Sequence, residues 1–408
     1  MRIFTAPVPT SVLALCALTA SLIGQGIVPP LVTNTVNPIA GIAAGPVPAN
    51  DVQQVHFVHL PTDPPNVFYC GLTGNLLSAS FGGVGGTDVV CGSYDVLTDT
   101  FTPNNDAAAL NTAGTEFGLT IHSSGLLAVF DRLPGAPWLA SRTAFGQPWQ
   151  IVGQISGLPS QGYYDPSLAT YRGQLQLLHV FGSSIAMTPL DPLTAALTGP
   201  SVVIVNPVTA SSTANSPTPV TDPNGELIGV SHHDLVGSDN DHYMSLDLDP
   251  STPTVLMNDT TTWTNNGGFI GGRFFDAEFT PSPYHVLSMD SFWFTGGRAS
   301  IGSTMYIRMF TPPTNGPEIY LSAFVASTSF LPSGLPLAGV SGLVGINPNG
   351  AFGSALILHD NRNGEAIGTL SIPNVTAFQG ISLPMQMATL EALSNTVYIG
   401  NTALFKID

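Results

Sequence analysis

A polar turn between two apolar runs recurs along the chain, and this repeat constrains the fold more than any other feature. The turns lie at Gly125, Gly173 and Gly225 and near Tyr284, at steps of 48, 52 and 59 residues. Short runs rich in β-branched and aromatic residues flank them, which favours strands. Repeats of about 40–50 residues with about four short strands each are typical of β-propellers. Because the segment 46–112 has the length of one more repeat, the sequence predicts five blades over 46–315.

The composition agrees with an all-β chain. It contains 43 Gly and 35 Pro, and only 9% of the residues are charged, against about 25% in a typical soluble protein. A β-sandwich is the alternative for 46–315, but the regular period argues against it. After residue 315 the pattern changes to short alternating strands, such as 351–360 and 395–408, which predict a separate module. The predicted fold class is therefore all-β, a five-bladed β-propeller followed by a small C-terminal β-sandwich over 316–408.

The N-terminus has the pattern of a secretory signal peptide. Arg2 precedes an apolar run over 12–23, and Gly24 and Gly26 are small residues at the −3 and −1 positions of a cleavage site. We expect a signal peptide over 1–26, a linker over 27–45, and a secreted, extracellular or cell-surface protein. No later run approaches the roughly 20 apolar residues of a membrane span.

Two cysteines remain after the predicted cleavage, Cys70 and Cys91. An even number of cysteines in an exported protein predicts a disulfide between them. A pair of free buried thiols is the alternative.

The net charge of −17 narrows the choice of partners. The chain has one lysine and eight arginines, so its surface repels nucleic acids and anionic membranes. The charge suits a carbohydrate or another neutral ligand, a cationic ligand or divalent cations. It is also compatible with a role in solubility alone.

Carboxylates recur at similar positions in the repeat. Glu116 lies nine residues before Gly125, and Asp165 lies eight before Gly173. Asp276 lies eight before Tyr284, with Glu278 close by. Because the first strand of each blade lines the channel of a propeller, we expect these side chains to meet at its mouth as catalytic candidates. Paired carboxylates are the groups that glycoside hydrolysis requires. The alternative is that Asp165 only starts a strand as a turn residue.

Other polar and aromatic residues are candidates for ligand and metal binding. His233 follows a predicted inner strand. A scarce arginine in a carboxylate-lined channel would pair with a carboxylate, and a tryptophan would stack on a sugar unless it lies in the strand core. The acidic stretch 231–249 is a candidate Ca²⁺ site without the pattern of a calcium loop, or a solvated acidic loop. We predict ligand binding by His233, Arg132, Arg172, Arg273 and Trp293, metal binding by Asp239, Asp241 and Asp247, and no required cofactor.

The stretch 165–180, "DPSLATYRGQLQLLHV", resembles the Asp-Pro repeats of the arabinanase and β-xylosidase clan of five-bladed glycoside hydrolases. The resemblance implies that one carboxylic acid protonates the leaving oxygen while a carboxylate activates water or attacks. The position equivalent to the family's acid holds Ser216, and the nearest candidates for its first-blade aspartate are Asp51 and Asp63. Residues 368–405 resemble accessory modules that end many secreted bacterial proteins.

Two function classes follow. One is a propeller without a catalytic motif that binds a neutral glycan or similar ligand at the channel mouth, with the sandwich as an attachment module. The other is a glycoside hydrolase with channel carboxylates as its acid and base. We expect binding, since the match to the catalytic site is incomplete.

Overall fold

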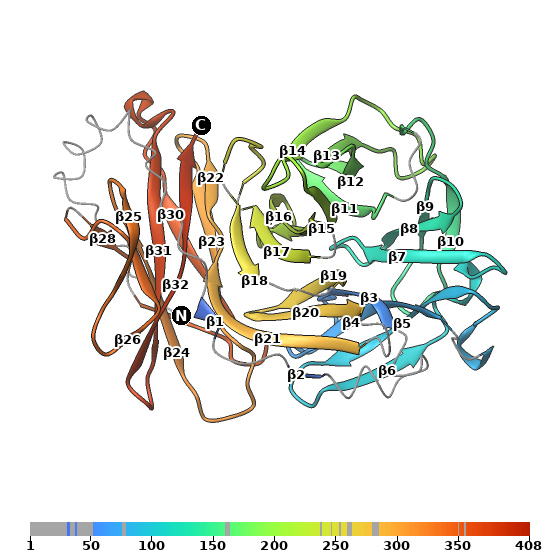
Figure 1. Cartoon of the computed structure of the whole chain (residues 1–408), viewed down its shortest axis with the longest axis horizontal. Coiled ribbons are helices and arrows are strands. Elements are labelled where there is room, and N and C mark those ends of the chain that lie inside the picture. The colour runs from blue at the N-terminus through green and yellow to red at the C-terminus, as the bar shows by residue number, and fades with distance from the viewer. Residues whose placement is uncertain are drawn as a thin grey trace.

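The computed structural model describes residues 31–32, 37–38, 52–75, 79–159, 164–236, 239–245, 247–252, 254–258, 263–279, 285–349, 351–354 and 356–408. The predicted signal peptide, its cleavage site and most of the predicted linker lie outside these residues. The all-β prediction is confirmed, because the described elements are mainly antiparallel sheets and a few short 3₁₀ helices, such as Ala108–Leu110 (Figure 1). Parallel pairs also occur, of β22 (Gly297–Ala299) and β26 (Val340–Ser341) with β32 (Thr396–Ile407). Among the described residues there is no helix with the length and apolar character of a membrane span.

Four sheets follow one another along the chain, and each consists of four consecutive antiparallel strands. The first sheet contains β3 (Val52–Val58), β4 (Val67–Asn75), β5 (Thr87–Asp95) and β6 (Thr100–Asn104). The second contains β7 (Thr115–Ile121), β8 (Leu127–Leu133), β9 (Pro137–Ser141) and β10 (Gln150–Gln154). The third contains β11 (Ser167–Tyr171), β12 (Gln174–Phe181), β13 (Ser184–Pro189) and β14 (Val202–Val205). The fourth contains β15 (Thr213–Thr221), β16 (Leu227–Val236), β17 (Asp239–Ser245) and β18 (Val255–Asn258).

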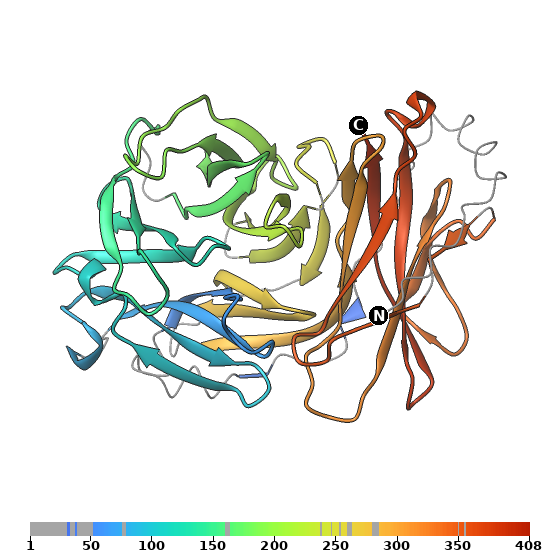
Figure 2. The same cartoon turned by 180° about the vertical axis from the view of Figure 1, so that it is seen from behind.

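A fifth sheet completes a ring with these four, in the arrangement of a β-propeller (Figures 1 and 2). It begins with β19 (Trp263–Ile270), β20 (Arg273–Phe279) and β21 (His285–Phe294). The first strand of each sheet contacts the first strand of the next, and β19 contacts β3. The five first strands therefore surround the middle of the ring.

The recurring glycines lie in the turns between the first and second strands. Gly125, Gly173 and Gly225 have φ of 67°, 71° and 84°, in the left-handed region that favours glycine. The equivalent turn of the fifth sheet holds Gly271, with φ 57°, and not the segment near Tyr284. That segment joins β20 to β21 and lies outside the described residues. The predicted alignment of the last repeat is therefore corrected by one strand.

The remaining strands form sheets beside the ring. β1 (Leu31–Val32) and β2 (Asn37–Pro38) pair with β21, and the other strands are β22 (Gly297–Ala299), β23 (Thr304–Phe310), β24 (Tyr320–Ala326), β25 (Phe330–Pro336), β26 (Val340–Ser341), β27 (Leu343–Ile346), β28 (Phe352–Gly353), β29 (Ile357–Leu358), β30 (Glu365–Ser371), β31 (Ser382–Glu391) and β32 (Thr396–Ile407). β21 pairs with β20 and, through its last two residues, with β23. β22 and β23 pair with β32 and β30, so strand pairing crosses the predicted boundary at residue 315.

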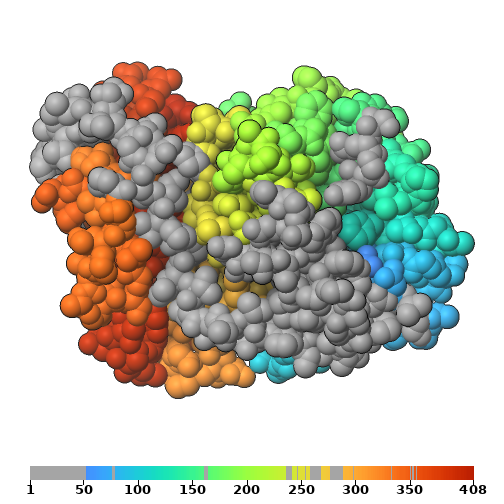
Figure 3. Space-filling model, viewed as in Figure 1, coloured from blue at the N-terminus to red at the C-terminus, as the bar shows by residue number. Residues whose placement is uncertain are grey.

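One hydrophobic core joins the ring to the C-terminal strands. It runs from Val220 and Met244 in the fourth sheet through Trp293 in β21 to Met387 and Phe405. The two parts lie directly against each other on the face in Figure 3, where the yellow end of the ring meets the orange and red strands. Burial of this continuous apolar surface favours a fixed arrangement of the two parts.

The predicted disulfide is wrong: Cys70 and Cys91 are free and buried. In the pairing of β4 with β5, Cys70 lies opposite Gly92, and Cys91 lies opposite Gly71. Because successive side chains in a strand point to opposite faces, the two thiols are on opposite faces of the sheet. They belong to different hydrophobic clusters.

Candidate functional site

Polar side chains from three first strands meet in the middle of the ring. Gln54 lies on β3, Asp165 lies two residues before β11, and Ser216 lies on β15. The Ser216 hydroxyl donates a hydrogen bond of 3.2 Å to Asp165 Oδ2. All three residues are at least nine-tenths buried. Together with Asp131, described below, they are called the inner-strand cluster.

A glycine on β7 leaves room for this cluster. A Cβ at Gly118 would lie 3.2 Å from Gln54 Oε1 and 3.8 Å from Pro166 Cδ. Gly118 also has φ 69°, which residues with a Cβ rarely adopt. The second sheet therefore contributes its backbone at the point where the other sheets contribute side chains.

The local backbone explains why these side chains point inward. Asp165 and Ser216 each precede a proline and have positive φ, 42° and 54°. The register of β15 shifts between Asn215 and Thr218, and similar shifts occur in β3, β7 and β19. Such irregularities redirect a side chain away from the alternation of a regular strand.

Asp131 is a member of the cluster that the sequence analysis did not identify. It lies on β8 and is fully buried. Its Oδ2 accepts the backbone N–H groups of Tyr164 at 2.9 Å and Asp165 at 3.0 Å. The sequence could have indicated Asp131, because it is an acidic residue inside the apolar run "LAVFDRL". A carboxylate that is buried in a strand needs hydrogen-bond or ionic partners.

The two aspartates of the cluster have raised pKa values. Burial and, to a lesser extent, the nearby Asp165 carboxylate raise the pKa of Asp131 to about 7, against the two N–H donors, which lower it. Burial also raises the pKa of Asp165 to about 6, against hydrogen bonding from Ser216. The Gln54 amide lies close enough to lower the pKa of Asp165 without completing a hydrogen bond.

Glu116 is engaged in a different set of contacts. It lies directly opposite Arg132 in the pairing of β7 with β8, and its Oε1 is 2.9 Å from Arg132 Nε. The backbone N–H and hydroxyl of Thr112 donate to its two oxygens at 3.0 and 2.6 Å. Arg132 also donates to the Leu110 carbonyl and lies 4.6 Å from the centroid of the Trp138 ring. These contacts join the second sheet to the segment that precedes it.

The candidates of the fifth sheet lie outside the first strand. Asp276 and Glu278 are on β20, the second strand, and their side chains lie outside the described residues. Arg273 faces Asp290 on β21 and donates to its two oxygens at 2.7 and 3.1 Å. Trp293 is fully buried and stacks on Phe310 at 4.1 Å, so its ring faces core side chains rather than solvent.

Two further ligand candidates lie at the third and fourth sheets. Arg172 is exposed in the turn after β11, and its guanidinium lies 5.2 Å from the centroid of Tyr171. Glu226 accepts the backbone N–H groups of Arg172 and Gly173, so this turn joins two neighbouring sheets. His233 is buried and stacks on His242, directly opposite on β17, at 4.7 Å.

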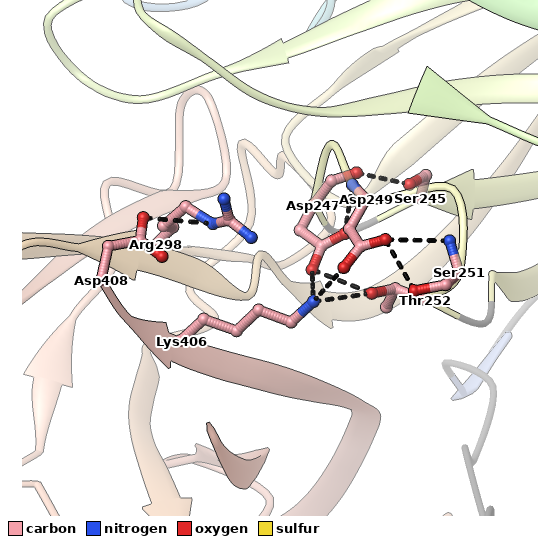
Figure 4. Close-up of polar contacts among 8 residues, drawn as sticks. All are labelled: Ser245, Asp247, Asp249, Ser251, Thr252, Arg298, Lys406 and Asp408. Atoms are coloured by element: carbon pink, nitrogen blue, oxygen red, sulfur yellow. Dashed lines mark hydrogen bonds and ion pairs between the residues drawn. The ribbon is translucent and has the colours of Figure 1, made fainter. Parts of the chain in front are cut away.

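Of the predicted metal ligands, Asp241 and Asp247 have described side chains, and each contacts a different partner. Asp247 lies 2.7 Å from the ammonium group of Lys406, which also contacts Asp249 at 3.2 Å and Thr252 at 2.9 Å (Figure 4). The ammonium group of Lys406 therefore already contacts the carboxylate oxygens of Asp247 and Asp249 in this loop. Asp241 receives a hydrogen bond from Tyr243, and the side chain of Asp239 lies outside the described residues. No group of three His, Cys, Asp or Glu side chains suited to a metal occurs among the described residues, and binding of Ca²⁺ stays a prediction.

Comparison with known proteins finds matches among solved structures only. No family model matches the chain, and no curated protein matches it. An exo-1,5-α-L-arabinanase from a bovine ruminal metagenomic library has 11% identity and a TM-score of 0.40, over 60% of this chain and 95% of that chain. The GH43B protein of the Bacteroides ovatus xyloglucan locus has 9% identity and a TM-score of 0.41, over 90% and 91%. A mutant of the GH43 protein BlXynB from Bacillus licheniformis has 9% identity and a TM-score of 0.40, over 90% of each chain. These solved structures thus include an arabinanase and two GH43 proteins, at low sequence identity.

Proposed function

We propose that the chain is a secreted five-bladed β-propeller with a C-terminal β-sandwich, and that it binds a neutral glycan or a similar hydroxyl-rich ligand at the inner-strand cluster without hydrolysing it. The observation that carries this proposal is the chemistry of the cluster. Gln54 supplies an amide, Ser216 a hydroxyl, and Asp131 and Asp165 carboxyl groups. These groups both donate and accept hydrogen bonds, as the hydroxyls of a sugar do.

The contacts of the predicted catalytic residues favour binding over hydrolysis. A hydrolase needs one carboxyl group as acid and a second as base or nucleophile. Ser216 holds the position expected for the acid, and a serine hydroxyl cannot replace a carboxylic acid there. Glu116, the other described candidate, is ion-paired with Arg132 and hydrogen-bonded to Thr112.

The charges of the chain support a neutral ligand. An anionic ligand would need free cationic groups near the cluster, and the net charge of −17 opposes it. Arg132 and Arg273 are engaged by Glu116 and Asp290. Hydroxyl groups need no such charge, because amides, hydroxyls and carboxyls suffice.

Glycoside hydrolysis is the second candidate, and one observation favours it. Asp131 and Asp165 are neighbouring carboxyl groups with raised pKa values, and a general acid requires a raised pKa to work near neutrality.

The test combines a binding assay with a product assay on the mature protein. We expect at least one neutral plant or microbial glycan from a panel to bind, with no release of reducing sugar. Gln54→Met and Asp165→Asn should weaken this binding about tenfold or more, the effect of about 1.4 kcal/mol. Asp191→Asn is the matched control, because Asp191 lies in the turn after β13, where its carboxylate accepts the backbone N–H of Leu193 and the hydroxyl of Thr194.

Two results would decide against the proposal. Failure of every neutral glycan to bind would remove it. Reducing-sugar release that Asp165→Asn abolishes and Asp191→Asn leaves unchanged would establish the hydrolase instead.

A further inference from the structure

We propose that Asp131 is a positioning residue for Asp165, and that the two carboxyl groups hold one proton between them in the inner-strand cluster. One consequence of this inference is that ligand affinity depends on the shared proton, and this consequence rests on the proposed function. The pair itself is a property of the unliganded protein.

The backbone contacts give Asp131 its positioning role. Its Oδ2 accepts the N–H groups of both Tyr164 and Asp165. Asp165 has φ 42° and precedes Pro166, a conformation that surrounding contacts must hold in place. A carboxylate of the second sheet thus orients the aspartate that enters the third sheet.

The buried oxygens explain why the pair needs a proton. Asp131 Oδ1 and Asp165 Oδ1 each lack a hydrogen-bond partner among the described residues. Asp131 is 0% exposed and Asp165 is 3% exposed. Two adjacent buried carboxylates cannot both ionise without a large desolvation and repulsion cost. One proton removes a charge and turns an unsatisfied acceptor into a donor.

Among the described residues, one arginine and two histidines near the pair are not available as cations that would replace this proton. Arg132, the neighbour of Asp131 in sequence, is ion-paired with Glu116. Burial lowers the pKa of His56 to about 4 and also lowers the pKa of His179, so both rings are neutral near pH 7. The titratable or charged groups on the strands packed against the pair are His56 of β3, Glu116 of β7, Arg132 of β8, Tyr171 of β11, His179 of β12, and His232, His233 and Asp234 of β16.

The direct test is the infrared carbonyl band of protonated carboxyl groups in the unliganded protein as a function of pH. We expect a band equivalent to one carboxyl group at pH 6 that disappears with a midpoint near pH 7. Asp131→Asn and Asp165→Asn should each lower that midpoint, because each removes one of the two carboxyl groups that share the proton. Asp88→Asn is the matched control, since Asp88 is a buried carboxyl with a raised pKa in the first sheet, and it should leave the band in place.

Carboxyl ¹³C NMR of the wild-type protein keeps the proposal falsifiable if a variant does not fold. A spectrum in which every aspartate is ionised at pH 6 would overturn the pair. So would a band that persists unchanged in folded Asp131→Asn and Asp165→Asn.

The binding consequence is measured separately with a glycan from the panel. We expect affinity to fall at least tenfold between pH 6 and pH 9, because the doubly ionised pair repels and displaces Asp165. Folded Asp131→Asn should flatten this profile, whereas Gln54→Met should weaken binding at every pH without flattening it. If the carboxyl band titrates near neutral pH but the protein binds no glycan, the aspartate pair is supported and only the proposed function is contradicted. A glycan affinity that does not change with pH would contradict the role of the proton.

Discussion

Gly118 is a residue at which a single added carbon would contact the inner-strand cluster. Its positive φ and its distance to Gln54 Oε1 are separate constraints. Gly173 shares the first constraint, with φ 71°, but a Cβ there would meet nothing within 4 Å. Comparing substitutions at the two glycines therefore distinguishes the effect of backbone strain from the effect of contact with the inner-strand cluster.

We predict that Gly118→Ala and Gly173→Ala each lower the free energy of unfolding by about 1–2 kcal/mol, the cost of a left-handed conformation for a residue with a Cβ. Only Gly118→Ala should also weaken ligand binding, because its Cβ displaces the Gln54 amide. Urea unfolding and glycan titration of both variants measure the two effects. Equal affinity for both would mean that Gln54 does not contact the ligand.

At the scale of elements, β32 is tied to the ring by the only lysine of the chain. Lys406 reaches from β32 to Asp247 and Asp249 in the loop between β17 and β18 (Figure 4). Its side chain is 17% exposed, whereas Arg298 and Asp408 form a looser pair, at 3.5 Å and 38% and 46% exposed. Burial makes the first pair less screened by water and salt than the second.

We expect Lys406→Met to lower the free energy of unfolding by about 1–3 kcal/mol, because it leaves the carboxylate of Asp247 without its cation. Arg298→Met, the control in the same picture, should change stability by less than about 0.5 kcal/mol. Chemical unfolding monitored by tryptophan fluorescence measures both. Equal losses in the two variants would contradict a specific role for the Lys406 contact.

At the scale of the whole molecule, buried histidines dominate the expected response to acid. Burial lowers the pKa of His122 and His359 to about 4 and that of His232 to about 3, from 6.5. The unfolded chain takes up these protons below about pH 6.5 and the folded chain does not, so each histidine favours unfolding as the pH falls from 6.5 towards 4. Asp131 and Asp165 act oppositely, because their folded pKa values are raised above 3.8. Their contribution to the free energy of unfolding is present at low pH and is lost as the pH rises towards 7.

We predict that the histidines prevail and that stability falls between pH 6.5 and pH 4.5. Burial also lowers the pKa of His56 to about 4 and lowers the pKa of His179. Burial raises the pKa of Asp88 and Asp234 as well, so five histidines oppose four aspartates. Each proton that the unfolded chain binds in excess of the folded chain lowers the free energy of unfolding by roughly 1.4 kcal/mol per pH unit of acidification. Calorimetric melting temperatures across this range test the sign, and a melting temperature that rises on acidification would show that the aspartates prevail instead.

The all-β class and the position of three hairpin turns followed from the sequence alone. Gly125, Gly173 and Gly225 could be recognised because turn chemistry and strand alternation act over a few neighbouring residues. Asp165 was found in the same way, since it lies eight residues before its turn, close to the nine residues between Glu116 and Gly125. The fifth turn was misplaced because the sequence does not distinguish Gly271 from the segment near Tyr284 by local pattern.

Pairing between distant strands decided the rest. Cys70 and Cys91 look like partners along the chain, but the register of β4 and β5 directs them to opposite faces. Glu116 resembles Asp165 in position, but Arg132 stands directly opposite it. Gln54, Asp131 and Ser216 meet Asp165 only because the first strands close into a ring. Local sequence sets which residues form strands and turns, whereas register and ring closure, which depend on contacts across the chain, set which side chains share a site.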